Sequence, residues 1–215
     1  MFVRDRMTAN PITISPSTPV YEALKIMKEN RIRRLPVVDG GVLVGIVTEL
    51  DLLRVSPSPA TSLSIYEIHY LMSKVSVKEA MTVDVITVDP GTLIEDAALL
   101  LRQRKIGGLP VLERGKLVGI ITETDIFDAF LEHLGSKQGG LRITFQVQDR
   151  AGELCRITQT LKELGINIQS VVVSHPGGGM ATVVMRLQGD QLEQVTTRLK
   201  DEGYAILDSR TNGAA

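Results

Sequence analysis

The sequence has little of several residue types that would point to particular classes of protein. It holds one cysteine, no tryptophan and 4% aromatic residues in 215 positions. A single thiol, Cys155, excludes an internal disulfide framework and fits a reducing cytosol. The longest apolar run, Ala97–Leu101, is far too short to span a bilayer, and the first residues lack the apolar core of a signal peptide. We therefore expect a cytoplasmic protein.

Charge of either sign is not in excess, which limits the partners that the chain can attract. The 24 basic and 25 acidic side chains give a net charge of −1. Residues 141–215 contain eight of each sign, so no part of the chain carries a basic field for nucleic acid. We expect neither a nucleic acid nor a membrane among the partners.

What the sequence does contain is an internal repeat with an offset of 74 residues. Residues 3–53 align with residues 77–127 without a gap, and 20 of the 51 pairs are identical. Agreement is closest where Leu43–Asp51 (LVGIVTELD) matches Leu117–Asp125 (LVGIITETD). A period of this length indicates one structural unit that is used twice.

Each copy of the repeat predicts the element order β-α-β-β-α. In the first copy, a helical spacing of apolar residues is followed by two β-rich runs, Leu35–Val38 and Leu43–Val47, joined by Gly40-Gly41. A second helix is expected to begin near Glu49. About fifty residues are few for a stable domain, so we expect the two copies to pack together around a pseudo-two-fold axis.

The remaining segments predict linkers and a second kind of domain. Val55–Ser64 is rich in Ser and Pro and predicts a loop, which a short helix over Ile65–Met72 follows. From Leu141 the spacing predicts the order β-α-β-β-α-β of a ferredoxin-like fold, so the whole chain is of the α/β (α+β) class. The expected divisions are a first copy at 1–60, a second copy at 61–134, a hinge at 135–140 and the C-terminal domain at 141–210.

These motifs resemble two known families. The repeat resembles the CBS domain in its tandem arrangement, the Bateman module, over residues 3 to about 134. The turn Asp149-Arg150-x-Gly152-x-Leu154, with its continuation Gly165-Ile166-Asn167, resembles the ACT domain, although Ala151 stands where ACT domains often have proline. Two CBS repeats followed by an ACT domain, with the linker Ser56-Pro57-Ser58, are similar to the acetoin-utilisation proteins of the AcuB type.

The element Thr-x-x-Asp occurs once in each copy, as Thr48-x-x-Asp51 and as Thr122-x-x-Asp125. A threonine N-cap with an acidic residue at the third helical position is a capping box, which explains both pairs without a ligand. A carboxylate also accepts hydrogen bonds from two vicinal hydroxyls, and in CBS domains the matching residues contact ribose. The two roles can hold together.

Basic residues follow the first predicted helix of each copy. They are Arg31, Arg33 and Arg34 in copy one and Arg102, Arg104 and Lys105 in copy two. Cations at this place complement the dipole of a helix C-terminus, at ~0.3–1 kcal/mol each. In nucleotide-binding CBS pairs, phosphate-binding side chains occur at the positions that match Arg33-Arg34, where copy two has Gly107-Gly108. We expect two unequal clefts, with the better polyphosphate site at the arginines.

The resemblance implies further ligand contacts in both parts of the chain. Thr13, Pro36, Thr87 and Pro110 match positions that line the nucleoside pocket of CBS pairs, although Thr13 and Thr87 are equally ordinary strand residues. In the ACT part, amides around Asp149 and Gly152 at a helix N-terminus would hold a carboxylate, and Asn167 would contribute from the same or a neighbouring subunit. The alternative is a plain tight turn in a domain that mainly dimerises.

The sequence contains no set of residues that suits catalysis or a metal. His69, His133 and His175 are scattered and lack partners at metal-ligand spacing. The predicted helix has Cys155 on its apolar side, so we expect this cysteine in the core. Glycines 177–179 predict a hairpin turn, because no Lys-Ser/Thr follows them.

The combined prediction is a non-catalytic regulatory protein that binds an adenine nucleotide, AMP, ADP or ATP, in the CBS-pair cleft. S-adenosylmethionine is a further candidate ligand, and no metal is expected. The alternative is that the ACT domain senses an amino acid or keto acid while the CBS pair is a structural dimerisation module. In both cases we expect a homodimer, because a four-stranded ACT sheet keeps open edges, and an unidentified client enzyme.

Overall fold

The computed structural model describes residues 1–56, 64–135 and 139–212, which form two compact units, Met1–Ile126 and Phe127–Ala215. Each unit is described by itself. Most of the expected loop at 55–64 and half of the expected hinge at 135–140 lie outside the described residues. Within the described ranges, no helix is both long enough and apolar enough to cross a membrane.

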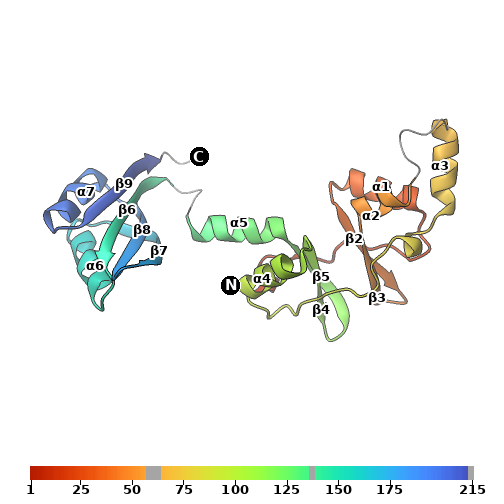
Figure 1. Ribbon diagram of the computed structural model, residues 1–215, viewed down its shortest axis with the longest axis horizontal. Coiled ribbons are helices and arrows are strands. Elements are labelled where there is room, and N and C mark those ends of the chain that lie inside the picture. Colours follow the sequence, from red (N-terminus) through yellow and green to blue (C-terminus); the bar gives the residue numbers. More distant parts are fainter. Residues whose placement is uncertain (57–63, 136–138, 213–215) are drawn as a thin grey trace. The chain divides into compact units, whose positions relative to one another are not determined.

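The first unit contains both repeat copies (Figure 1). Copy one has the predicted order β-α-β-β-α, whereas in copy two the first strand is reduced to an isolated bridge at Thr82. The elements of the first copy are η1 (Val3–Asp5), β1 (Thr8–Ala9), α1 (Val20–Glu29), β2 (Arg34–Asp39), β3 (Val42–Thr48) and α2 (Glu49–Arg54). In the sequence, helix α3 (Ile65–Lys74) lies between the two copies. Those of the second copy are η2 (Val77–Glu79), α4 (Ile94–Arg104), β4 (Gly108–Glu113), β5 (Lys116–Thr122) and α5 (Glu123–His133), which continues into the second unit.

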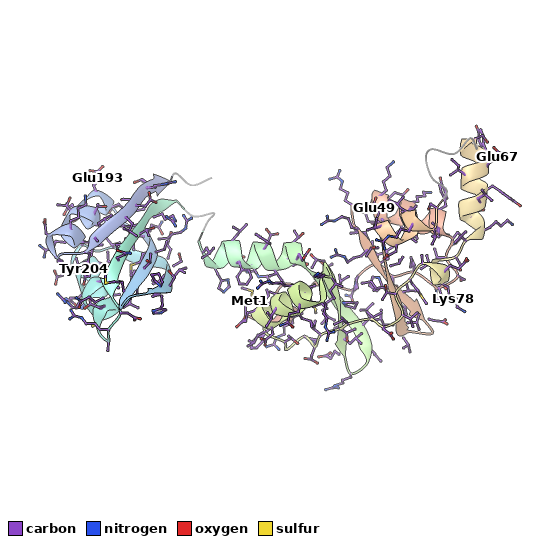
Figure 2. The ribbon with its side chains drawn as sticks, viewed as in Figure 1. Met1, Glu49, Glu67, Lys78, Glu193 and Tyr204 are labelled. Atoms are coloured by element: carbon purple, nitrogen blue, oxygen red, sulfur yellow. The ribbon has the colours of Figure 1, made fainter. Side chains whose placement is uncertain are left out.

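Each copy is built on an antiparallel hairpin that carries the centre of its core. Strand β2 pairs with β3, and β4 pairs with β5 in the same register 74 residues later. In the first copy, Leu35, Val37 and Val47 are fully buried against Met27 of α1 and Leu52 of α2. Glu49, labelled in Figure 2, opens α2 directly after β3, as the sequence predicts.

The two copies exchange their first extended segments, which the sequence did not predict. Thr8 of β1 pairs with Ile120 of β5 in the other copy, and Thr82 forms a bridge to Ile46 of β3. The adjacent methionines pack closely on glycine: a Cβ at Gly45 would lie 2.6 Å from the Sδ of Met81. This reciprocal exchange joins the copies into one unit, and it builds the space between them from both.

The second unit is an antiparallel sheet with two helices on one face (Figure 1). Its elements are β6 (Gly140–Gln148), α6 (Glu153–Glu163), β7 (Asn167–Gly177), β8 (Met180–Gln188), α7 (Leu192–Asp201) and β9 (Ala205–Asn212). The strand order β7-β8-β6-β9 is that of a ferredoxin-like fold, so the predicted fold class is confirmed. Tyr204, labelled in Figure 2, packs in this core with its ring centroid 5.9 Å from that of Phe145.

One face of α6 differs from the prediction. Cys155 is exposed and Leu154 is 42% exposed, so the expected place of Cys155 in the core is wrong. Glu153 is buried instead, with 6% of its surface exposed. Its carboxylate is held by Arg150 on the preceding turn and by Tyr204, which lies 51 residues further along the chain. These partners, Arg150 above all, make burial of an acidic residue tolerable, because a buried charge needs hydrogen bonds.

Candidate functional site

A cleft of about 370 Å³ lies between the two repeat copies, and we name it the Asp125 cleft. Copy two contributes the end of β5 and the start of α5, whereas copy one contributes β1 with the segment after it and the start of β2 with the segment before it. Its lining residues are Thr8, Asn10, Pro11, Ile12, Arg31, Ile32, Arg33, Arg34, Pro36, Ile120, Thr122, Thr124 and Asp125. The exchange of segments is what brings residues of both copies to this one place.

The carboxylate in this cleft is held in place by a capping box at the start of α5. Thr122 donates to the Oδ2 of Asp125 from its backbone N–H at 2.8 Å and from its hydroxyl at 2.7 Å. The amide of Asp125 points back to the threonine Oγ1 at 3.4 Å. Among the described residues, the Oδ1 of Asp125 has no hydrogen-bond partner. The helix cap therefore occupies one carboxylate oxygen, and the other is available to a ligand.

Basic side chains surround the same cleft. Arg31 has a left-handed backbone, with φ of 54°, as the chain leaves α1 and turns toward β2. This conformation costs a non-glycine residue roughly 1–2 kcal/mol. With Arg33 and Arg34, the cleft contains three cationic side chains and the one carboxylate of Asp125, a net charge of +2.

Burial and neighbouring charges act on Arg34 in opposite directions. Burial lowers the pKa of the Arg34 guanidinium from its usual value, and the adjacent Arg33 lowers it further. Glu123 and Asp125 raise the same pKa, because each favours the charged form. Arg34 thus faces two carboxylates of copy two, even though it belongs to copy one.

A second cleft, of about 350 Å³, lies at the place that the repeat relates to the first, and we name it the Asp51 cleft. Its lining residues are Arg34, Ile46, Thr48, Asp51, Thr82, Asp84, Val85, Ile86, Lys105, Ile106, Gly107 and Gly108. The capping box recurs, with the Thr48 hydroxyl 2.6 Å from the Oδ2 of Asp51. Here two cations and two carboxylates give a net charge of zero, so the two clefts differ in charge as well as in sequence.

The clefts contain most of the residues that the sequence singled out. Arg33, Arg34, Pro36, Thr122 and Asp125 line the Asp125 cleft, while Thr48 and Asp51 line the Asp51 cleft. Thr13, Thr87 and Pro110 line neither cleft.

Strand geometry explains the positions of the two threonines. Thr13 and Thr87 each precede a residue whose backbone is bridged to the hairpin, Ile14 to Val37 and Val88 to Val111. Their neighbours Ile12 and Ile86 line the clefts instead.

Sequence reasoning missed one pair of lining residues that the repeat itself relates, Asn10 in one cleft and Asp84 in the other. Arg31 and Lys105, which the sequence named among the basic residues, correspond in the same way and share a left-handed φ of 54°. A position-by-position comparison of the copies would have found Asn10 and Asp84.

In the second unit, the predicted ACT ligand residues do not gather in one place. Gly152 lines an open hollow beside α6 with Arg150, Arg156 and Arg198, but neither Asp149 nor Asn167 does. Asp149 instead faces His175 at 2.9 Å, and Asn167 is exposed at the start of β7. The first turn of α6 already holds a carboxylate of the chain's own, Glu153. The Arg150 side-chain hydrogen bond lowers the pKa of Glu153, and the charges of Arg150 and Arg156 act in the same direction against its burial.

A metal site does not emerge from the described ranges 1–56, 64–135 and 139–212. Within them, no three His, Cys, Asp or Glu side chains stand close enough together to hold an ion. The carboxylates and guanidinium groups that line the two clefts suit recognition of hydroxyls and of anions.

Two copies that exchange their first extended segments, enclose paired clefts and precede a ferredoxin-like domain in the chain define a class of tandem-repeat modules. The sequence profile of the CBS domain matches residues 3–58 and 77–132, and the chain belongs to the CBS domain family. Residues 139–210 match the TTHA0829-like ACT domain.

Solved structures are similar to this chain over 61–64% of its length. The structure of CBSX2 in complex with AMP is 37% identical and covers 61% of this chain and 96% of its own, with a TM-score of 0.50. The CBS pair of MJ0100 with 5′-methylthioadenosine and S-adenosylmethionine is 30% identical and covers 64% and 98%, with a TM-score of 0.51. A Vibrio cholerae protein described as AcuB, of acetoin utilisation, is 31% identical and covers 64% and 97%, with a TM-score of 0.52.

Proposed function

We propose that this chain is a non-catalytic regulatory protein that binds an adenine nucleotide, AMP, ADP or ATP, in the Asp125 cleft. One observation carries the proposal: a helix-capping carboxylate with an unengaged oxygen shares a cleft of net charge +2 with three arginines. A nucleotide combines vicinal hydroxyls with phosphates, and the cleft offers the matching groups together. The CBS pairs that are solved with AMP and with adenosine derivatives support the choice of ligand.

Each part of the ligand has a partner in the proposal. The Oδ1 of Asp125 accepts hydrogen bonds from the ribose hydroxyls, while its Oδ2 remains in the helix cap. Arg31 and Arg33 contact the phosphates, since a planar guanidinium binds phosphate with two parallel hydrogen bonds. The apolar side chains of Ile12 and Pro36 contact the adenine ring. S-adenosylmethionine, which has no phosphate, would use the ribose and adenine contacts alone.

Regulation requires that the ligand bind two arrangements of the protein with different affinity. We infer that nucleotide binding changes the packing of the two copies and so the surface offered to a client enzyme. Likeness to the Vibrio cholerae protein supports a setting in acetoin utilisation, and the single cysteine supports a reducing, cytoplasmic one. Exposed Phe127 and Phe130 on α5 and the open edge strand β7 support a homodimer.

Thermal unfolding with a ligand panel tests the proposal and its alternative. The panel holds AMP, ADP, ATP, S-adenosylmethionine and the common amino acids, and a ligand at a hundred times its Kd stabilises by ~2.7 kcal/mol. We expect a nucleotide to raise Tm in the wild type, and to raise it less in Asp125→Ala, which loses the ribose contact of the Asp125 cleft. Absence of any nucleotide shift at millimolar concentration would refute the proposal. A shift from one amino acid that Asn167→Ala removes would favour the ACT alternative, in which the CBS pair serves dimerisation.

A further inference from the structure

Arg34 is the one described residue that lines both clefts. It stands at the first position of β2 in copy one, and its side chain extends to the segment before β4 in copy two. There its Nη1 donates a hydrogen bond to the backbone carbonyl of Gly107. The guanidinium thus lies between the two sites and does not belong to one of them.

Two glycines make room for this contact. A Cβ at Gly107 would lie 2.5 Å from the Nη2 of Arg34, and a Cβ at Gly108 would lie 2.5 Å from its Nη1. The guanidinium therefore occupies the space that side chains at these two positions would fill, and we call Gly107-Gly108 the seat of Arg34. Because Gly107-Gly108 are the repeat equivalents of Arg33-Arg34, copy two has no side chain that returns the contact. A side chain of copy one therefore contacts copy two at this place, and the equivalent positions of copy two have no side chain to contact copy one.

The position of Arg34 decides the charge of the Asp51 cleft. With Arg34 on its seat, that cleft holds Arg34 and Lys105 against Asp51 and Asp84, a net charge of zero. Without Arg34 the same cleft has a net charge of −1. The Asp125 cleft keeps Arg31 and Arg33 in either case, so only the Asp51 cleft becomes net negative without Arg34.

We propose, resting on the proposed nucleotide function, that Arg34 couples the two clefts so that a phosphate ligand in the Asp125 cleft weakens binding of a second in the Asp51 cleft. Phosphate in the Asp125 cleft draws the guanidinium off Gly107-Gly108, and the Asp51 cleft is left with excess negative charge. Coupling between two sites is reciprocal, so a phosphate ligand bound first in the Asp51 cleft weakens the other site by the same factor.

Calorimetric titration of the full-length protein with ADP measures this coupling. In the wild type, the second binding step reports the Asp51 cleft while the Asp125 cleft is full. In Asp125→Ala, the Asp51 cleft binds alone, and additional Asp51→Ala identifies it by abolishing that binding. We expect the Kd of the Asp51 cleft to be roughly tenfold lower in Asp125→Ala than in the second wild-type step, within the range known for coupled sites.

Two variants separate the role of Arg34 from that of the fold. Arg34→Ala removes the guanidinium. Gly108→Ala keeps the guanidinium but displaces it from Gly107-Gly108, because the new Cβ would overlap it. The backbone of Gly108 is not left-handed, so its conformation accepts alanine. In each of these backgrounds we expect the Asp51 cleft to have the same Kd with and without Asp125→Ala. Arg104→Ala removes an exposed arginine that lines neither cleft, and it should preserve the tenfold ratio.

The outcomes distinguish this inference from the function on which it rests. An Asp51-cleft Kd that is the same in Asp125→Ala and in the second wild-type step, or a ratio that persists in both Arg34→Ala and Gly108→Ala, would overturn the coupling and leave nucleotide binding intact. Loss of all ADP binding in Asp125→Ala would likewise overturn the coupling alone, because the Asp51 cleft would then hold no nucleotide. Failure of the wild type to bind ADP at millimolar concentration would overturn both.

Discussion

The Asp125 cleft and the hollow beside α6 both contain three arginines, but these arginines differ in what they already contact. In the cleft, Arg31 and Arg33 form no ion pair with any described residue. In the hollow, every arginine is engaged. The pairs are Arg150 with Glu153 at 2.5 Å, Arg156 with Glu153 at 3.7 Å, and Arg198 with Glu163 at 3.6 Å and with Glu202 at 3.8 Å.

The arginines of the hollow therefore already have anionic partners, whereas Arg31 and Arg33 of the Asp125 cleft have none among the described residues. A phosphate in the Asp125 cleft gains charge-assisted hydrogen bonds and breaks no ion pair. An anion in the α6 hollow would have to displace Glu153, which is buried against Tyr204 and would be left without its partner. The comparison favours the first unit for ligand recognition and gives the charges of the hollow a role in holding the second unit together.

The largest effect should come from the core of the second unit. Phe145 is fully buried, so Phe145→Ala should destabilise that unit by ~3–5 kcal/mol through lost burial and a residual cavity. If the first unit alone recognises the nucleotide, the Kd for ADP should not change. Denaturant unfolding followed by far-UV circular dichroism, with ADP titration of the same sample, checks both. A parallel loss of ADP affinity would contradict the assignment of ligand binding to the first unit.

The next largest effect distinguishes the free arginines from the paired ones. Arg33→Ala should weaken ADP binding to the Asp125 cleft by roughly tenfold to a hundredfold, since a hydrogen bond to a charged group contributes ~1.5–3 kcal/mol. Arg198→Ala, the matched change in the hollow, should leave the ADP affinity unchanged. Isothermal titration of both variants decides the matter. Equal losses in the two would show that the unpaired state of Arg33 has no bearing on ligand binding.

Local patterns in the sequence predicted the elements and many lining residues because they depend on neighbours along the chain. The capping boxes at Thr48 and Thr122 span three residues, and each hairpin is closed by a two-residue turn, so both are visible as motifs. The 74-residue repeat then placed the same motif twice.

Contacts between distant segments were beyond the sequence because no local pattern encodes them. Gly107-Gly108 looked like the loss of two arginines, whereas in the structure they seat Arg34, which lies 73 residues from Gly107. The buried Glu153 likewise has a distant partner, Tyr204, 51 residues away, beside its local partner Arg150. The helical spacing alone favoured Cys155 for the core. In both cases the sequence did not show a contact between distant segments.

A smaller effect should appear in the acid stability of the second unit. The pKa of Glu153 in the folded protein is lowered from its ordinary value of 4.5, first by the Arg150 hydrogen bond, while Tyr204 and Arg156 also face it. A lowered folded pKa contributes stability that is present above pH 4.5 and is lost as the pH falls through the folded pKa. Glu153→Gln should therefore flatten the acid limb of a stability-against-pH curve.

The matched control for that curve is Glu163→Gln, which removes an exposed carboxylate of the same helix. Its acid limb should follow that of the wild type. If Glu163→Gln flattened the curve as much as Glu153→Gln, the buried position of Glu153 would not explain its contribution to stability against acid.

The smallest effect concerns how the helices of the two units begin. Helix α5 starts with the Thr122 capping box, whereas α6 starts at Gly152 without a side-chain cap. Thr122→Ala should cost the first unit ~1 kcal/mol, and because Asp125 loses a donor that orients it, ADP binding should weaken a few-fold. Thr158→Ala, which removes an exposed hydroxyl bonded to a carbonyl of α6, should change neither quantity. A stability loss in Thr122→Ala without any change in ADP affinity would show that the cap and the ribose contact are independent, and that Asp125 is held for the helix rather than for the ligand.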